Sequence, residues 1–391
     1  MSRNFFILAF VMKLSVVLGQ QPDSAQIDLV DVVIGKKRLE STNQIRSERK
    51  IHFSLLPAAV SIPGGGRAVI TAVNAAFYLG NPEETNLSNI YIIPYTNFVD
   101  RYGIYVRPNI WIAKNNFNIT GDYRIAHFPQ YSWGLGGDTP QWDETLIDSD
   151  YFRFYQTILT QLYKNWYFGP GYFLDYHYNI EEKDFEGLGH LDRYKNGTLT
   201  STNSSGITAN LVFDARKNAI NPQGGAYVIT SWRWNIEALG STFNNQSFFI
   251  DARKYFKLSN RRNHILAIRS YYWTIVSGET PYLDLPATTW TPSQGLASRG
   301  FQTGRYRSNA MLYGEAEQRY TLTANGLWGF VVFANLSSAS EFETQHFHYW
   351  QLGAGVGLRA KFNKYSNSNI AVDFGFSQNY WGVWVNIGEV F

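Results

Sequence analysis

The chain has 391 residues, of which 17% are aromatic and 17% are charged, with a formal net charge of +3 and no cysteine. The lack of cysteine excludes disulfides, thiolate catalysis and cysteine-based metal sites. The small net charge, without a basic patch, argues against nucleic acid as a partner. Aromatic residues favour strands, and Tyr and Trp favour membrane interfaces. A slightly negative mean hydropathy excludes a bundle of membrane helices but fits a β-barrel with a polar interior.

Residues 1–19 have the features of a secretory signal peptide. Arg3 precedes the apolar runs 5–12 and 14–18, and the small residue Gly19 follows them. A membrane anchor helix needs about 20 apolar residues, and Lys13 interrupts this shorter run. We therefore predict cleavage near Gly19.

The segment 20–49 is mostly polar and is expected to remain as a short periplasmic segment. Apolar residues recur at helical spacing between Ile27 and Ile34. This spacing predicts a short amphipathic helix, followed by the basic cluster Lys36–Arg38 as a solvated tail.

From residue 51 to residue 391 the sequence predicts one transmembrane β-barrel. Apolar and polar residues alternate in blocks of the length that a tilted membrane strand requires, about 9–11 residues, and turn-forming residues separate the blocks. We predict sixteen antiparallel strands, near 51–60, 68–80, 90–99, 102–113, 118–128, 150–162, 165–179, 206–215, 225–237, 246–258, 262–276, 309–323, 326–338, 348–362, 368–377 and 382–391. An even number is typical of single-chain bacterial barrels.

The last three predicted strands have the clearest alternation. One face is apolar and is expected to contact lipid: Trp350, Leu352, Val356, Leu358, Val372, Phe374, Val383, Val385, Ile387 and Phe391. The other face includes Gly353, Gly355 and Gly357, which are expected to point into a polar lumen. This Gly-x-Gly-x-Gly run has no helix after it, so a nucleotide-binding loop is excluded by context. The three glycines instead leave a trough in which another backbone can come close.

The segment 296–309, "LASRGFQTGRYRSN", carries several arginines between the eleventh and twelfth predicted strands. This connection is long enough to fold into the lumen. A buried guanidinium there requires an acceptor. The twelfth strand offers Glu315 and Glu317 beside Arg319, and the thirteenth offers Phe333 and Asn335 on its lumen face. We predict that these residues and the glycine trough hold the loop.

At these positions the chain resembles the BamA/TamA-type outer-membrane assembly barrels, the bacterial surface antigen family. The family's loop-tip motif is matched by Arg299-Gly300-Phe301, and its Glu-x-Arg-aromatic strand motif by Glu317-Gln318-Arg319-Tyr320. A family hairpin motif is matched by Asp214, Arg216, Asn221, Pro222 and Gly225. The end "VNIGEVF", with Asn386, Gly388 and Phe391, resembles the terminal strand signal through which such barrels are recognised.

The chain departs from the family pattern in two places. Asn335 stands where the family usually has an aspartate, so Arg299 is expected to depend on Glu317 and the loop to be held more loosely. Members that assemble or secrete proteins usually carry POTRA modules before the barrel. The segment 20–49 is too short for one, since a single βαβ unit takes about 30 residues or more. The resemblance therefore implies a member without POTRA modules.

Catalytic and metal chemistry is weakly supported. His346 and His348 can be read as two metal ligands on one face, with Glu341 or Glu343 nearby, but solvated loop residues are the better interpretation. No Ser/His/Asp set stands out. We expect no enzymatic activity, no cofactor and no metal.

The resemblance implies a role in inserting or translocating proteins, or lipids, at the outer membrane. In the family the first and last strands meet at a weak seam, here the strands near 51–60 and 382–391. The expected partners are the lipid bilayer, outer-membrane client proteins and periplasmic accessory proteins. The alternative is a passive channel or structural barrel that kept the fold and lost the assembly role.

Overall fold

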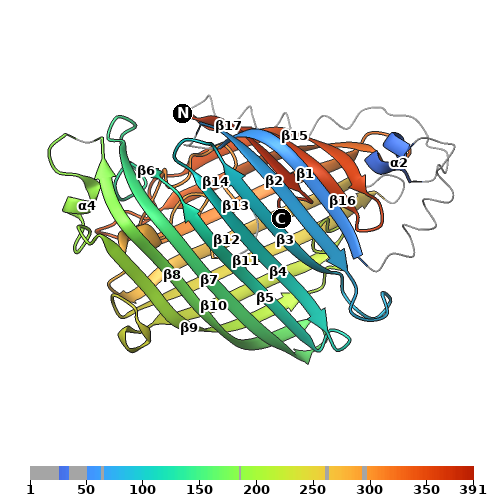
Figure 1. The fold of residues 1–391 in the computed structure, drawn as a ribbon, viewed down its shortest axis with the longest axis horizontal. Helices are drawn as coiled ribbons and strands as arrows, with labels where there is room; N and C mark the ends of the chain where they lie inside the picture. Colours follow the sequence, from blue (N-terminus) through green and yellow to red (C-terminus); the bar gives the residue numbers. More distant parts are fainter. Residues whose placement is uncertain (1–25, 35–50, 63–65, 185, 260–263, 293–296) are drawn as a thin grey trace.

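The computed structural model describes residues 26–34, 51–62, 66–184, 186–259, 264–292 and 297–391. These residues form a single, nearly closed antiparallel β-barrel (Figure 1). The predicted signal peptide and most of the segment 20–49 lie outside the described residues. None of the helices in the described ranges is long and apolar enough to cross a lipid bilayer.

Sixteen long strands form the wall, as predicted. They are β1 (Ile51–Ile62), β2 (Gly66–Phe77), β3 (Ser88–Thr96), β4 (Tyr102–Ile112), β5 (Phe117–His127), β7 (Thr145–Tyr163), β8 (Trp166–Lys183), β9 (Ser201–Asp214), β10 (Gly225–Asn235), β11 (Asn245–Ser259), β12 (His264–Gly278), β13 (Ala310–Thr321), β14 (Trp328–Ala339), β15 (Gln351–Asn363), β16 (Ser368–Phe376) and β17 (Trp381–Ile387). Consecutive wall strands pair in antiparallel register from β1 to β17.

One further strand, β6 (Gln130–Ser132), was not predicted. It pairs only with the first residues of β7, at Thr145–Ile147. With three residues it is too short to show an alternation. β7 also starts five residues earlier than predicted. The acidic residues Asp148 and Asp150 are typical of a loop, but the alternation of buried and exposed residues continues through them.

The strands present an apolar outer surface and a polar interior, as the alternation requires. In β15, Val356 is 54% exposed and Leu358 is 57% exposed, while Gly355, Gly357 and Arg359 between and beside them are buried. The barrel interior therefore contains many buried polar and charged side chains, together with buried apolar clusters.

The two ends of the barrel differ. One end, called the turn end here, carries short connections such as 113–116, 164–165 and 364–367. The other, the loop end, carries the long ones, including 128–144 with β6, 184–200 with α4 (His190–Arg193) and 279–309 with two short elements. The helix α2 (Leu29–Ile34) lies at the turn end beside β15, within the segment for which a helix was predicted.

The 279–309 connection, between β12 and β13, folds into the lumen as predicted. It begins with the 3-10 helix η3 (Tyr282–Asp284). Its side chains are buried against strand residues from several walls, with Trp290, Phe301 and Tyr306 in one cluster together with Tyr151 and Tyr313. The loop thus forms the centre of the barrel's largest buried cluster.

Candidate functional site

The tip of the lumen loop is anchored by Arg299, whose side chain is fully buried. Its Nη1 donates to Asp373 Oδ2 at 2.5 Å, and its Nη2 donates to Glu317 Oε2 at 2.5 Å and to Glu315 Oε1. The guanidinium also lies over the Phe333 ring, 3.6 Å from the centroid, a cation–π geometry. Burial alone lowers an arginine pKa, but the three carboxylates outweigh it and hold the pKa of Arg299 well above its usual range.

The backbone of the tip is held as closely as its side chain. Asn335 Nδ2 donates to the Arg299 carbonyl at 2.9 Å. Gly300 has φ +97°, a left-handed conformation that favours glycine, and a Cβ on it would lie 2.8 Å from the Phe376 carbonyl oxygen. A Cβ on Gly375 would in turn lie 2.9 Å from the Gly300 amide nitrogen. The tip can reach β16 only because glycines lie on both sides of the contact.

The predicted glycine trough contains side chains as well as backbone. A Cβ on Gly353 would lie 2.8 Å from the Phe301 ring and 3.0 Å from the Arg299 carbonyl oxygen. Gly355 makes space for the Phe333 ring, and Gly357 for the Asp373 carboxylate. We call the set Arg299–Phe301, Glu315, Glu317, Phe333, Asn335, Gly353 and Asp373 the loop dock.

The sequence prediction missed one member of the dock, Asp373. The expectation that Asn335 leaves Arg299 short of charge is therefore wrong: Asp373 provides a carboxylate from β16, and Glu315 provides another from β13. The signal was present, because Asp373 is the only carboxylate in the predicted strand 368–377 and alternates onto its lumen face. In the barrel it pairs in register with Gly357 of the trough.

Arg319, predicted as a docking partner, does not contact Arg299 directly. Its Nε donates to Glu317 Oε1 at 2.7 Å, and its Nη2 donates to the Phe391 carbonyl oxygen at 2.9 Å. Arg359 connects the same regions from β15, through Asp373 at 2.6 Å and Glu389 at 2.7 Å. The loop dock and the C-terminal residues therefore share one network of ion pairs.

Two other arginines of the lumen loop, Arg305 and Arg307, form no ion pair with a carboxylate among the described residues. Arg307 donates to the Tyr282 carbonyl oxygen at 2.8 Å and to Gln130 Oε1 at 2.9 Å. Arg305 donates to the Thr139 carbonyl oxygen at 2.7 Å. Burial lowers the pKa of both guanidinium groups. These two arginines connect the loop to β6 and to the 128–144 connection.

The orientation predicted for two apolar residues near position 391 is wrong. Ile387 and Phe391 were expected to face lipid, but they are 1% and 3% exposed. Ile387 lines a cavity inside the barrel, and Phe391 lies in a buried cluster with Tyr255. β17 ends at Ile387, and Gly388, with φ +94°, turns the residues after it into the barrel. The Phe391 ring then packs with Tyr255. Whether Asn386, Gly388 and Phe391 also serve as a recognition signal stays a prediction.

The hairpin motif and the histidine pair that the sequence singled out form only local contacts. Asp214, the last residue of β9, accepts two hydrogen bonds from the Arg216 guanidinium, and the buried Asn221 donates to the Asn367 carbonyl oxygen. The rings of His346 and His348 stack at an exposed loop. Across the described ranges, no group of three or more histidines and carboxylates is placed to hold a metal ion.

The first and last wall strands, β1 and β17, lie side by side, and we call their contact the seam. Every other neighbouring pair of wall strands is paired in antiparallel register over at least seven residue pairs. Among the described residues, no register joins β17 to β1. β17 has seven residues and β1 has twelve, so part of the β1 edge extends beyond its neighbour.

The barrel fold is similar to that of two solved structures, BamA and CdiB. The chain is similar to BamA from Haemophilus ducreyi lacking POTRA domains 1-3, at 11% identity and a TM-score of 0.53, over 91% of this chain and 78% of that one. It is also similar to CdiB from Acinetobacter baumannii, at 13% identity and a TM-score of 0.54, over 87% of this chain and 60% of that one. The chain has a BamA-type barrel fold. No protein-family model and no curated protein sequence matches it.

Proposed function

We propose that this BamA-type barrel resides in the outer membrane and assists the insertion or translocation of proteins, or of lipids, across that membrane. The observation that carries the proposal is the seam, where the ladder of the wall is interrupted between β17 and β1. The apolar outer face, with residues such as Val356 and Leu358 exposed, supports the placement in lipid.

The seam provides a physical mechanism without bond chemistry. A strand edge in hydrocarbon leaves backbone N–H and C=O groups unsatisfied, at a cost of several kcal/mol per group. An incoming strand that pairs with the β1 edge removes this cost by β-augmentation. The barrel would therefore offer a client segment its first hydrogen-bonding partner in the membrane.

The loop dock would act as the rigid element of this mechanism. It binds the lumen loop to β13, β14, β15 and β16, the strands that lead to the seam. Because three ion pairs and a cation–π contact meet at Arg299, this side of the barrel resists deformation while β17, shorter and less paired, can move.

The alternative remains a passive channel or a structural barrel. One of its supports in the sequence was Asn335, interpreted as the loss of a charge partner for Arg299, and this support is weakened because Asp373 and Glu315 provide the charge. The two functions differ in whether the seam must open.

Disulfide locking of the seam tests this difference, and the natural chain contains no cysteine to interfere. A panel of cysteine pairs would combine Phe53 or Leu55 in β1 with Val383 or Val385 in β17. The control pair is Ala334 with Ala354, which face each other in the closed β14–β15 ladder. The readouts are the level of outer-membrane proteins in cells depleted of the native copy, and assisted folding of a client barrel in proteoliposomes.

We expect the oxidised seam pairs to abolish both activities and reductant to restore them, while the control pair has no effect. If oxidised seam pairs support cells as well as the unmodified protein does, while depletion still has a phenotype, the insertion role is wrong. A structural or lumen role would then explain the phenotype.

A further inference from the structure

The helix α2 is bound to two connections of the wall at the turn end. Lys364, between β15 and β16, donates its backbone N–H to Asp28 Oδ2 and its Nζ to Asp31 Oδ2, both at 2.9 Å. The Ile27 amide donates to the Asn325 carbonyl oxygen, between β13 and β14, at 3.0 Å. Both aspartates are buried. The helix is therefore docked on the barrel through its two carboxylates.

Charge rather than apolar packing orients α2. Asp28 and Asp31 bind each other's backbone amides at 3.0 Å, as in a capping box, and both also bind Lys364. Val32 and Val33, by contrast, are exposed. Isolated helices shorter than about 12–15 residues are marginal in water, and α2 has six. Its position therefore depends on Lys364, because charge-assisted hydrogen bonds are the strong contacts that it makes.

The residue after Lys364 contacts the first strand of the wall. The Tyr365 ring stacks on the His52 ring of β1, with centroids 5.5 Å apart and 12° between the planes. Lys364 Nζ lies 5.5 Å from the same Tyr365 centroid. Tyr365 belongs to the turn beyond Ile370–Ile387, the last residue pair of β16 with β17. The stack therefore joins β1 to the strands on the other side of the seam, past the end of β17.

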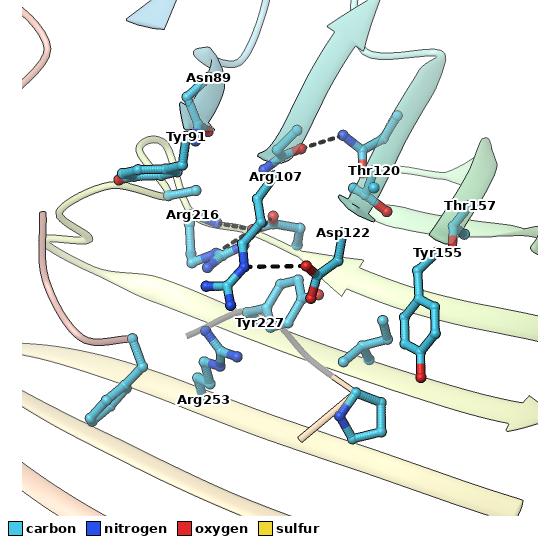
Figure 2. Close-up of a pocket in the computed structure, with 18 of the residues that line it drawn as sticks. Asn89, Tyr91, Arg107, Thr120, Asp122, Tyr155, Thr157, Arg216, Tyr227 and Arg253 are labelled. Atoms are coloured by element: carbon cyan, nitrogen blue, oxygen red, sulfur yellow. Dashed lines mark hydrogen bonds and ion pairs between the residues drawn. The ribbon is translucent and has the colours of Figure 1, made fainter. Parts of the chain in front are cut away.

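On the β17 side of the seam, the C-terminal residues are held from inside the barrel. Glu389 accepts from Arg359 Nε at 2.7 Å. It also lines a cavity of about 170 Å3, in which Arg107 of β4 is paired with Asp122 of β5 at 3.5 Å (Figure 2). Neither of these ion pairs includes a residue of β1. The interior thus fixes the end of the chain, while β1 meets the far side of the seam through the turn that also binds α2.

We propose that α2 is a clasp that holds the seam closed from the turn end. Docked α2 fixes the position of Lys364, and this turn in turn keeps the Tyr365 ring on His52. Once α2 is released, the stack weakens and the first residues of β1 separate from β17. The proposal rests on the seam opening that the proposed function requires, and it names the element that controls this opening.

The clasp explains how a seam without a ladder stays closed at rest. A seam that opened freely would leave backbone groups of β1 unsatisfied in lipid. Release of α2 breaks contacts at the surface of the turn end and leaves the loop dock, with its buried Arg299, intact. The barrel can therefore open at one place without losing the rigidity of β13 to β16.

Labelling of a single buried cysteine measures the opening, because the natural chain contains none. The reporter is Ser54→Cys, two residues after His52 on the same face of β1, where the serine is fully buried. Ser337→Cys, also buried but in the closed β14–β15 ladder, is the control reporter. The full-length barrel in lipid nanodiscs is treated with a charged maleimide, and the labelling rate is measured.

Two variants break the clasp at different points. Asp28→Ala combined with Asp31→Ala removes the carboxylates that bind Lys364, and Tyr365→Leu removes the stack on β1. The control variant is Glu84→Ala, because Glu84 forms another carboxylate–lysine pair at the turn end, with Lys114 at 2.9 Å, away from α2. Heat-modifiability on gels verifies that every variant is folded.

We expect each clasp variant to speed the labelling of Ser54→Cys about tenfold or more, with no change for Ser337→Cys or in Glu84→Ala. Tenfold corresponds to about 1.4 kcal/mol, close to the contribution of one hydrogen bond to a charged group. The variants combined should label no faster than the faster of the two, because both act through the contact between Tyr365 and His52.

Wild-type labelling in the double aspartate variant would show that α2 is not a clasp. An effect of this variant that multiplies with that of Tyr365→Leu would show the same, since α2 would then act by another route. Labelling needs no client protein and is independent of the disulfide-locking experiment. Faster labelling in a barrel whose locked form still supports client folding would keep the clasp and reject the insertion role.

Discussion

Replacing Arg299 with alanine tests the physical basis of the loop dock. The substitution removes the one cation that three buried carboxylates share, but they are not affected equally. Glu317 keeps Arg319 at 2.7 Å, and Asp373 keeps Arg359 at 2.6 Å. Among the described residues, Glu315 keeps only the Tyr313 hydroxyl. One carboxylate is therefore left buried without a counter-charge.

The expected loss of folding stability follows from the one carboxylate that is left without a counter-charge. Breaking a buried ion pair from one side costs about 3–5 kcal/mol, and the lost cation–π contact with Phe333 adds about 0.5–2 kcal/mol. Arg307→Ala is the matched control, because Arg307 is equally buried but donates only to neutral acceptors, and its loss should cost about 1–3 kcal/mol. Adding Glu315→Gln to Arg299→Ala should restore part of the stability, because it neutralises the stranded charge.

Urea unfolding and refolding in detergent micelles, followed by tryptophan fluorescence and by heat-modifiability on gels, measures these differences. Equal destabilisation by Arg299→Ala and Arg307→Ala would refute the reasoning. So would a double variant no more stable than Arg299→Ala alone, since the stranded Glu315 would then not be the source of the cost.

Two further predictions concern glycine packing and the end of the chain. Gly353→Ala should displace the loop tip and lower stability by about 1–3 kcal/mol, the usual range for overpacking, while Gly314→Ala, whose Cβ would meet nothing within 4 Å, should be close to neutral in the same urea assay; equal effects would exclude the close approach. Phe391→Ala should cost about 3–5 kcal/mol in purified protein refolded in detergent, because the ring is buried against Tyr255. An effect of Phe391→Ala seen only in cells would instead support a recognition signal without a packing role.

The barrel wall was predictable because it follows from a local rule. Apolar and polar residues alternate along each strand, and no knowledge of the neighbouring strands is needed to find sixteen such segments. The inward loop was predictable because a long connection rich in arginine needs buried acceptors, and the strands after it supplied them.

Other features depend on information that alternation does not contain. Asp373 joins Arg299 only because β16 pairs with β15 in a particular register, and register is set by the turns and the whole barrel. Phe391 reads as lipid-facing by its apolar character, yet one glycine with positive φ at position 388 reverses its direction.

The network of ion pairs also connects the loop dock with the C-terminal residues that follow β17. Arg359 binds Asp373 of the dock and Glu389 of the C-terminal residues, and Glu389 also accepts from Asn369 at 2.6 Å. If this chain of contacts transmits force, Glu389→Gln and Arg299→Ala should not be independent. Side chains in one network show coupling energies of about 0.5–3 kcal/mol, whereas separate sites add to within about 0.3–0.5 kcal/mol. We expect a coupling energy above about 1 kcal/mol for this pair in a double-mutant cycle, and additive effects for Glu389→Gln with Arg307→Ala.

Additive effects in both cycles would mean that the loop dock and β17 are stabilised independently. The lumen loop would then have no influence on the movement of β17.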